Sequence, residues 1–221
     1  ILIDVSSIEN LERIYNSILR AHVSGFPEEI ISIVPKLTQA TLSIYNKIIN
    51  NYHVHHLNLL YIQSSDLSRI YEGLLRSTLD KFNSKDGFIR LWRNEVTRVF
   101  VDRLITDEDK LLITGKEIPA LIKEHFSDSF ENVMIDPILF GDYMTQIIRL
   151  DNVDPKLYED CGNFDRVSIK FNQLLSDYNE EKKEMNLVLF KDALEHLTKI
   201  HRILRFPLGH ALLVGFGGSG K

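Results

Sequence analysis

The sequence predicts a mainly helical protein that ends in the opening of an α/β domain. Most of the chain repeats apolar residues at helical spacing, and glycine and proline are sparse, at 11 and 6 of 221 residues. A short apolar run and a glycine-rich segment close the chain. The expected order is a helical domain over residues 1–126, an irregular connector over 127–165 and the start of a second domain over 166–221.

Five helices are expected in residues 1–126. Ser6 and Glu9 match a capping box for the first, which should end near Gly25. The second carries its apolar stripe to Ile48, and Pro35 is expected to break or kink it. Residues 50–56 are expected to form a loop. The third helix should begin at an N-cap within 64–66. The fourth should span about 86–104, and a fifth, with a weaker pattern, should span about 117–126.

Helical periodicity fails from 127 to 165, where Asp-Pro, Phe-Gly and Cys-Gly-Asn sequences indicate turns. It returns around 167–178 and again around 187–204. A turn is expected at Leu208-Gly209, leading into an apolar run over 210–214 that is typical of a buried parallel strand. The second domain is therefore expected to open with helices, a strand and the glycine-rich segment.

The glycine-rich segment matches the first seven positions of a phosphate-binding loop, G-x-x-x-x-G-K. Glycines let successive backbone N–H groups converge on a phosphate, and the lysine adds a positive charge. The Ser/Thr that would hold Mg²⁺ and the helix that would complete the anion site would follow the motif. The alternative is a chance match in a glycine-rich tail, but the apolar run before it favours the loop. The residues are Gly215, Phe216, Gly217, Gly218, Ser219, Gly220 and Lys221.

Composition excludes several classes of partner. The net charge is −5, from 26 basic and 31 acidic residues, so no nucleic acid is expected. No run approaches the ~18 apolar residues of a membrane-spanning helix, and no secretion signal opens the chain, so no membrane is expected. The single Cys161 suits a reducing compartment such as the cytoplasm. The missing initiator Met and the ending within a motif suggest a piece of a longer protein.

Other candidate residues favour structural roles, so no catalytic residue and no metal site is expected. His53, His55 and His56 cluster without the Cys pairs or helical spacing of a zinc site. Cys161 lies in no nucleophile motif, and His201 is five residues from His196, too far round a helix to chelate with it.

Four arginines lie among aromatic residues on the expected fourth helix. An arginine can stabilise phosphate charge, but ordinary surface ion pairs are the simpler interpretation, and the sequence does not single one out. They are Arg90, Arg93, Arg98 and Arg103.

Several segments, in their order, resemble the dynein heavy chain family, and the likeness covers nearly the whole chain. It implies the small helical (lid) subdomain of the third AAA+ module, followed by the first helices, strand and phosphate-binding loop of the α/β large subdomain of the fourth. The segments are Phe26-Pro27, VPKLTQATLSIYN (34–46), SDLSRI (65–70), LWRNE (91–95), RVFVDRL (98–104), FGDY (140–143), YED (158–160) and MNLVLFKDALEH (185–196).

The resemblance implies an ATP-driven, minus-end-directed microtubule motor. ATP or ADP with Mg²⁺ would be the cofactor, bound through the backbone N–H groups of 216–221 and the Lys221 ammonium. Partners would be the neighbouring AAA+ modules of the same chain, microtubules and other dynein chains. The Gly-Gly-Ser-Gly form of the loop resembles axonemal heavy chains, which implies the cytoskeleton of a cilium or flagellum.

One position departs from the family pattern. Family members commonly carry an arginine before the Asp-Leu-Ser motif, at a sensor-2 position that reaches the γ-phosphate, and Ser65 stands here instead. The resemblance also implies that the chain holds no complete nucleotide site, so that it should not hydrolyse ATP by itself. The alternatives are another multi-module AAA+ or P-loop NTPase, or a non-catalytic helical scaffold.

Overall fold

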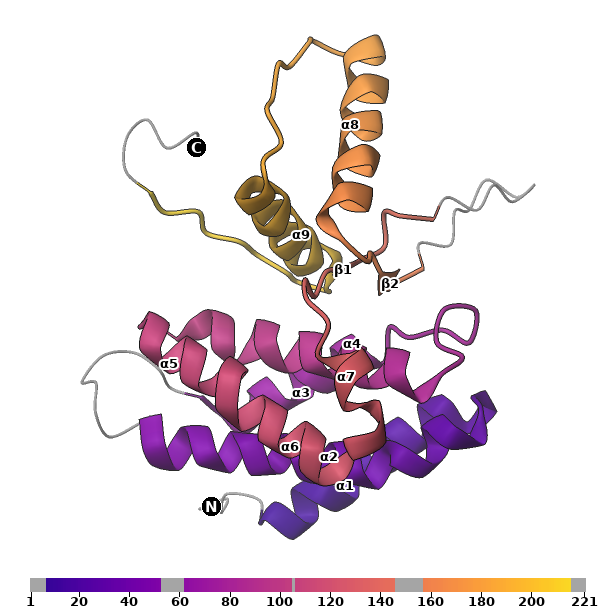
Figure 1. Ribbon diagram of the computed structural model, residues 1–221, viewed down its shortest axis with the longest axis vertical. Coiled ribbons are helices and arrows are strands. Elements are labelled where there is room, and N and C mark those ends of the chain that lie inside the picture. Colours follow the sequence, from indigo (N-terminus) through magenta and orange to yellow (C-terminus); the bar gives the residue numbers. More distant parts are fainter. Residues whose placement is uncertain (1–6, 53–61, 105, 146–156, 216–221) are drawn as a thin grey trace. The chain divides into compact units, whose positions relative to one another are not determined.

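A computed structural model describes residues 7–52, 62–104, 106–145 and 157–215. The chain forms two compact units: unit 1 comprises Ile1–Ile138 and Leu157–Glu159, and unit 2 comprises Leu139–Lys156 and Asp160–Lys221. No helix in these described ranges is long and apolar enough to cross a membrane. The elements of unit 1 (Figure 1) are α1 (Ile8–His22), η1 (Val23–Gly25), α2 (Glu28–Tyr52), α3 (Ser64–Leu74), α4 (Lys85–Val99), η2 (Val101–Arg103), α5 (Asp107–Leu112), η3 (Ile113–Glu117), α6 (Ile118–His125), η4 (Ser127–Ser129) and α7 (Phe130–Val133).

The helix starts follow local capping. Ser7, one residue later than expected, caps α1 by accepting a hydrogen bond of 3.3 Å from the backbone N–H of Asn10. The expected cap Ser6 lies outside the described residues. Helix α3 is capped by Gln63 rather than by a residue within 64–66, and the Gln63 N–H donates to the Asp66 carboxylate at 2.9 Å.

Pro35 does not break α2, which is continuous from Glu28 to Tyr52 and so extends into the residues expected to form a loop. A proline inside a helix loses one backbone hydrogen bond and costs about 3 kcal/mol. Val34, directly before it, and Leu37, two residues after it, are almost completely buried, so tertiary packing offsets that cost.

Helix α4 lies at the centre of the unit 1 core. Phe88, Leu91, Trp92 and Val96 are fully buried, and the Trp92 indole N–H donates to the Thr41 hydroxyl at 2.8 Å. This bond joins α4 to α2 and satisfies two polar groups inside the core. The helix expected over about 86–104 is thus confirmed over Lys85–Val99, and its apolar residues form a core face.

The same helix also buries polar residues that its apolar stripe does not predict. Glu95 is fully buried and accepts hydrogen bonds from the Asn94 amide at 2.9 Å and the Tyr158 hydroxyl at 3.0 Å. Its carboxylate also lies against the backbone of α3 at Gly73, where an added Cβ would collide with it. Residue 73 must therefore lack a side chain.

Unit 2 contains β1 (Phe140–Gly141), α8 (Phe164–Glu181) and α9 (Lys191–Arg205), and β1 pairs with β2 (Glu159–Asp160) in a two-stranded sheet. Asn163 caps α8 by accepting a 3.0 Å hydrogen bond from the backbone N–H of Arg166. The small core consists of Leu139, Cys161, Val167 and Leu194, flanked by Tyr143, Met144, Phe164, Phe171 and Leu189.

Two expectations on domain organisation are corrected. The segment 127–165 is not a single irregular connector: η4 and α7 continue unit 1, and the first division between the units falls after Ile138. These helical pieces are three and four residues long, too short to produce a visible periodicity.

The run 210–214 is not a strand either, and Leu212 and Val214 are 89% and 86% exposed. A strand needs a hydrogen-bonded neighbour, and in the described part of the chain none pairs with this run.

Replacing Gly73 with alanine should lower the free energy of unfolding of unit 1 by about 1–3 kcal/mol, because the new methyl group overpacks the site of the Glu95 carboxylate. Trp92 is the only tryptophan in the sequence and lies in unit 1, so urea unfolding followed by its fluorescence measures this effect. Gly115→Ala is the matched control, because nothing lies within 4 Å of its added Cβ. Equal stability of the two variants would contradict the steric reading.

Unit 1 should also lose stability as the pH falls through the titration of His22. Burial lowers the pKa of His22 below its ordinary 6.5, although a hydrogen bond with the Ser77 carbonyl partly opposes this. The unfolded chain therefore binds more protons than the folded one below about pH 6.5, and the free energy of unfolding should fall there.

The measurement is urea unfolding by Trp92 fluorescence between pH 8 and pH 5. His22→Gln keeps a donor toward Ser77 and should flatten the slope of stability against pH in this range. Titrations of the other groups are common to both proteins and cancel in the comparison. Identical slopes would show that His22 is not the group responsible.

Candidate functional site

The structure describes the approach to the glycine-rich motif rather than the motif itself. Of its seven residues only Gly215 lies within the described residues, and Phe216, Gly217, Gly218, Ser219, Gly220 and Lys221 lie outside them. The donor set that the sequence supplies, consecutive backbone N–H groups and one ammonium, suits a phosphate chain.

The turn expected at Leu208-Gly209 is confirmed. After α9 the Gly209 N–H donates to the Phe206 carbonyl at 3.0 Å, and Leu208 adopts the left-handed backbone conformation with φ of 55°. A Cβ at Gly209 would collide with the carbonyl of Ile203, so glycine is needed to let the chain pass the end of α9. The run that leads to the motif therefore starts from a defined turn.

The end of α9 is held by a buried carboxylate, Asp142, whose side chain is fully inaccessible to solvent. It accepts a hydrogen bond of 2.7 Å from Nε of Arg205, the last residue of α9, and a short one from Nε2 of His201, one turn earlier. One turn earlier again, the Thr198 hydroxyl lies 2.9 Å from the Tyr143 hydroxyl. Three successive turns of α9 thus contact the segment that follows β1.

The side chains that contact Asp142 keep its carboxylate ionised. Burial by itself would raise the pKa of Asp142, but the hydrogen bonds and positive charge of His201 and Arg205 outweigh burial and hold the pKa well below its ordinary 3.8. Burial raises the pKa of Tyr143 above its ordinary 10.0, so this side chain remains a neutral phenol. The last turns of α9 are therefore fixed to an ionised carboxylate by two side chains, His201 and Arg205.

The second predicted site residue, Ser65, lies in the first turn of α3 with an exposed side chain. Its hydroxyl donates only a long 3.4 Å hydrogen bond, to the Gln63 amide oxygen. The next residue, Asp66, is buried and forms ion pairs with Arg103 at 2.6 Å and Arg69 at 3.2 Å. Ser65 is therefore a free surface position beside a neutralised carboxylate.

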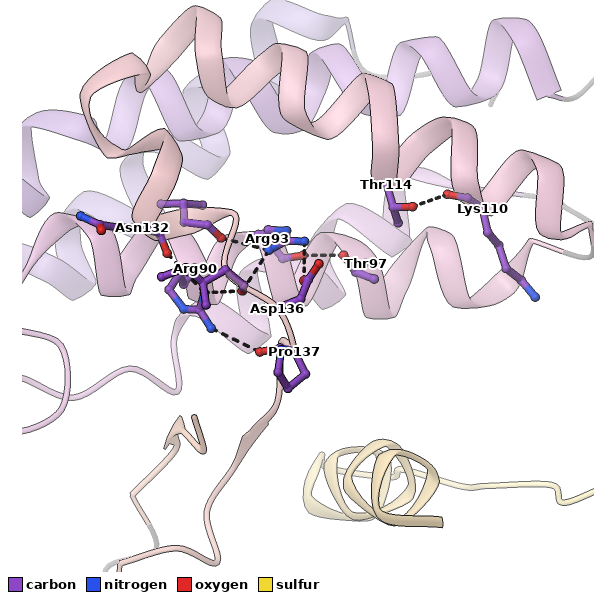
Figure 2. A network of polar contacts seen from close by, with 10 residues as sticks. Arg90, Arg93, Thr97, Lys110, Thr114, Asn132, Asp136 and Pro137 are labelled. Carbon is purple, nitrogen blue, oxygen red and sulfur yellow. Dashed lines mark hydrogen bonds and ion pairs between the residues drawn. The ribbon is translucent and has the colours of Figure 1, made fainter. Parts of the chain in front are cut away.

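Each of the four arginines singled out on the fourth helix bonds to protein groups within unit 1. Arg103 pairs with Asp66, and Arg98 pairs with Asp102 at 3.0 Å. Arg90 and Arg93 bind the segment after α7, as Figure 2 shows. These contacts agree with the structural interpretation of the arginines.

The remaining candidates do not assemble into a site. Cys161 is buried in the core of unit 2, and its thiol lies 3.5 Å from the Tyr143 hydroxyl. Within the described residues no group of three His, Cys, Asp or Glu side chains is placed to hold a metal ion. His53, His55 and His56 lie outside those residues.

The sequence analysis did not predict the contacts of Asp142 with His201 and Arg205, called here the Asp142 anchor, or the buried polar groups of α4. Asp142 lies in a segment without periodicity, and its partners are 59 and 63 residues away. The only available signal was His201 and Arg205 at i and i+4, which places both side chains on one face of α9.

Comparison with known proteins gives the family. A family model described as "Dynein heavy chain, ATPase lid domain" matches residues 14–110, and one described as "P-loop containing dynein motor region D4" matches residues 185–221. The chain is 46% identical to human dynein axonemal heavy chain 10 over 216 residues, which is 97% of this chain and 5% of the relative.

Two further relatives cover the chain as fully. The chain is 43% identical over 226 residues to the dynein-1-alpha heavy chain of the flagellar inner arm I1 complex of Chlamydomonas reinhardtii (99% of this chain, 5% of the relative). It is 35% identical over 215 residues to the ciliary dynein beta chain of Heliocidaris crassispina (96% of this chain, 5% of the relative). The chain therefore spans about 5% of the length of these relatives. Nucleotide binding is a property of the AAA region that the D4 model describes. The chain belongs to the dynein heavy chain family.

Proposed function

We propose that this chain serves an ATP-driven, minus-end-directed microtubule motor of cilia or flagella. The observation that carries the proposal is the order of the two matches: a dynein lid over residues 14–110 and a P-loop region of dynein motor D4 over residues 185–221. The three relatives compared above are named as axonemal, flagellar or ciliary chains, which supports the axoneme as the location.

Each unit has a separate part in the proposal. Unit 1 is the lid of the nucleotide site of the third AAA+ module, and residues 215–221 begin the phosphate-binding loop of the fourth. Backbone N–H groups from Phe216 to Lys221 and the Lys221 ammonium would hold the phosphates of ATP or ADP, with Mg²⁺ supplied as the counter-charge. Both sites would take further residues from the rest of the heavy chain, so this chain alone should not turn over ATP.

Lys221→Ala in the full-length heavy chain tests the assignment of the loop. Loss of the ammonium should reduce the amount of nucleotide that remains bound after gel filtration by close to one molecule per heavy chain, because one of several sites is disabled. Microtubule gliding by the same preparation reports whether the parent chain is a motor.

The matched control is Lys183→Ala, an exposed lysine in the segment between α8 and α9. It should leave the bound nucleotide unchanged. Unaltered nucleotide content in Lys221→Ala would support the scaffold alternative, and nucleotide binding without microtubule gliding would support a different AAA+ NTPase.

We also propose that Ser65 slows hydrolysis at the third module's site. A serine hydroxyl can donate one hydrogen bond but carries no charge to stabilise the γ-phosphate in the transition state. Its exposed position in the first turn of α3 leaves room for a longer side chain. The neighbouring Arg69 and Arg103 are both paired with Asp66.

Ser65→Arg should therefore accelerate hydrolysis at this site by about tenfold or more, a modest share of what a transition-state arginine can contribute. The measurement is single-turnover hydrolysis in full-length heavy chain that also carries Lys221→Ala, so that the fourth module does not contribute. Ser64→Arg adds the same charge at the adjacent exposed position and should have little effect. An unchanged rate in Ser65→Arg would contradict the proposal that Ser65 slows hydrolysis at this site.

A further inference from the structure

The end of α9 is held by polar contacts rather than by the apolar core of unit 2. Among the described residues, the buried core includes one residue of this helix, Leu194, which lies near its start. The later turns contact the segment after β1 through the side chains of Thr198, His201 and Arg205. Arg205 is also the last residue of the helix. The Asp142 anchor therefore acts on the part of α9 from which the chain continues toward the glycine-rich motif.

The segment after β1 is shaped to hold α9. An added Cβ at Gly141 would collide with the ring of Tyr143, so glycine is needed to let this ring lie close to the backbone. The Tyr143 hydroxyl is then 2.9 Å from the Thr198 hydroxyl, and its ring meets the His201 ring edge to face, with 5.1 Å between the ring centres. This contact orients the imidazole that binds the Asp142 carboxylate.

A buried carboxylate is a poor source of stability at the end of a helix. Taking its charge out of water carries a desolvation cost that an ion pair often only balances, and apolar side chains of similar size can do as well. A buried ion pair instead favours one arrangement, because its hydrogen bonds form in one geometry. Asp142 accepts from Nε of Arg205 and from Nε2 of His201, so both contacts restrict the last turns of α9 in distance and in direction.

The chain leaves α9 through a turn with little freedom. Leu208 is in the left-handed conformation, and the Gly209 N–H donates to the Phe206 carbonyl at 3.0 Å. Five residues, 210–214, then lead to Gly215, the first residue of the motif. Five extended residues span about 17 Å at most, so a displacement of the turn displaces the start of the motif. A slip of one residue in an extended run also reverses the side to which every side chain points.

We propose that Asp142 is a positioning residue for the phosphate-binding loop of the fourth module. It fixes the last turns of α9, and the turn at Leu208-Gly209 passes that position on to the run that leads to Gly215. Asp142 thus acts through the chain, and it sets the affinity for ATP or ADP. Backbone N–H groups bind a phosphate chain well only where they converge on it, so the placement of the loop decides the affinity. This role rests on the proposed binding of nucleotide by residues 216–221.

Asp142→Asn in the full-length heavy chain tests this role, since it keeps the size of the side chain and removes its charge. Titration with N-methylanthraniloyl-ATP identifies the site of the fourth module as the one that Lys221→Ala abolishes. The dissociation constant of this site should rise about tenfold in Asp142→Asn, while the number of sites per heavy chain stays the same. Amide hydrogen exchange over residues 206–209 should accelerate, and exchange within α8 should be unchanged.

The number of sites separates positioning from a purely structural role. If the substitution only unfolded unit 2, fewer molecules would bind nucleotide, and those that did would bind it with unchanged affinity. Arg205→Gln is a second variant, which removes one hydrogen bond and leaves the His201 contact in place. It should raise the dissociation constant about threefold, and Asp142→Asn should then have a smaller effect than in the unaltered protein, because the two side chains act together.

Asp177→Asn is the matched control, because Asp177 is an exposed aspartate on α8 of the same unit. It should change neither the dissociation constant nor the exchange over 206–209. An unchanged dissociation constant in both Asp142→Asn and Arg205→Gln overturns the positioning role, and so does a loss of sites at unchanged affinity. If Lys221→Ala abolishes no site, the proposed nucleotide binding by the loop is contradicted, and the positioning role fails with it.

Discussion

The burial of one carboxylate, that of Glu95, constrains several segments of unit 1 at once. A polar group with no access to water must find all its partners within the protein. It therefore needs an amide beside it on α4, a phenol from a segment 63 residues away and a backbone on α3 without a side chain. Burial of this group therefore depends on α4 itself, on the close approach of α3 to α4 and on the return of the chain at Tyr158.

Residue periodicity predicted α1, α2, α3, α4 and α6, each of which buries apolar side chains, but it did not predict α5, which buries none. It failed where tertiary packing or strand pairing decides whether a segment forms a helix or a strand. Pro35 was expected to break or kink α2, but α2 is continuous, and the burial of Val34 and Leu37 offsets the cost of the proline. The apolar residues of 210–214 favoured a strand, yet hydrophobicity supplies no hydrogen-bonded neighbour. Likewise, periodicity gives no sign that the polar side chains of residues 93–95 are buried, because the partners that satisfy them lie far away in the sequence.

The candidate site likewise has one part that the sequence predicts and one part that it does not. The phosphate-binding motif is readable because its chemistry depends on consecutive residues, whereas the Asp142 anchor of α9 joins residues far apart and has no local signature. The arginines of α4 agree with the structural interpretation that the sequence favoured over phosphate chemistry, because Arg90 and Arg93 donate to carbonyl groups at the end of α7 and just after it.

The interleaving of the two units affects how the protein is made. Glu95 leaves the ribosome 63 residues ahead of Tyr158. At translation rates of about 5–20 residues per second, the buried carboxylate waits roughly 3–13 s for its partner. During that interval unit 1 holds an incomplete core, and the first residues of unit 2 have already been synthesised. Folding of unit 1 is therefore completed only after the first residues of unit 2 have been synthesised, so that the folding of the two units overlaps during synthesis.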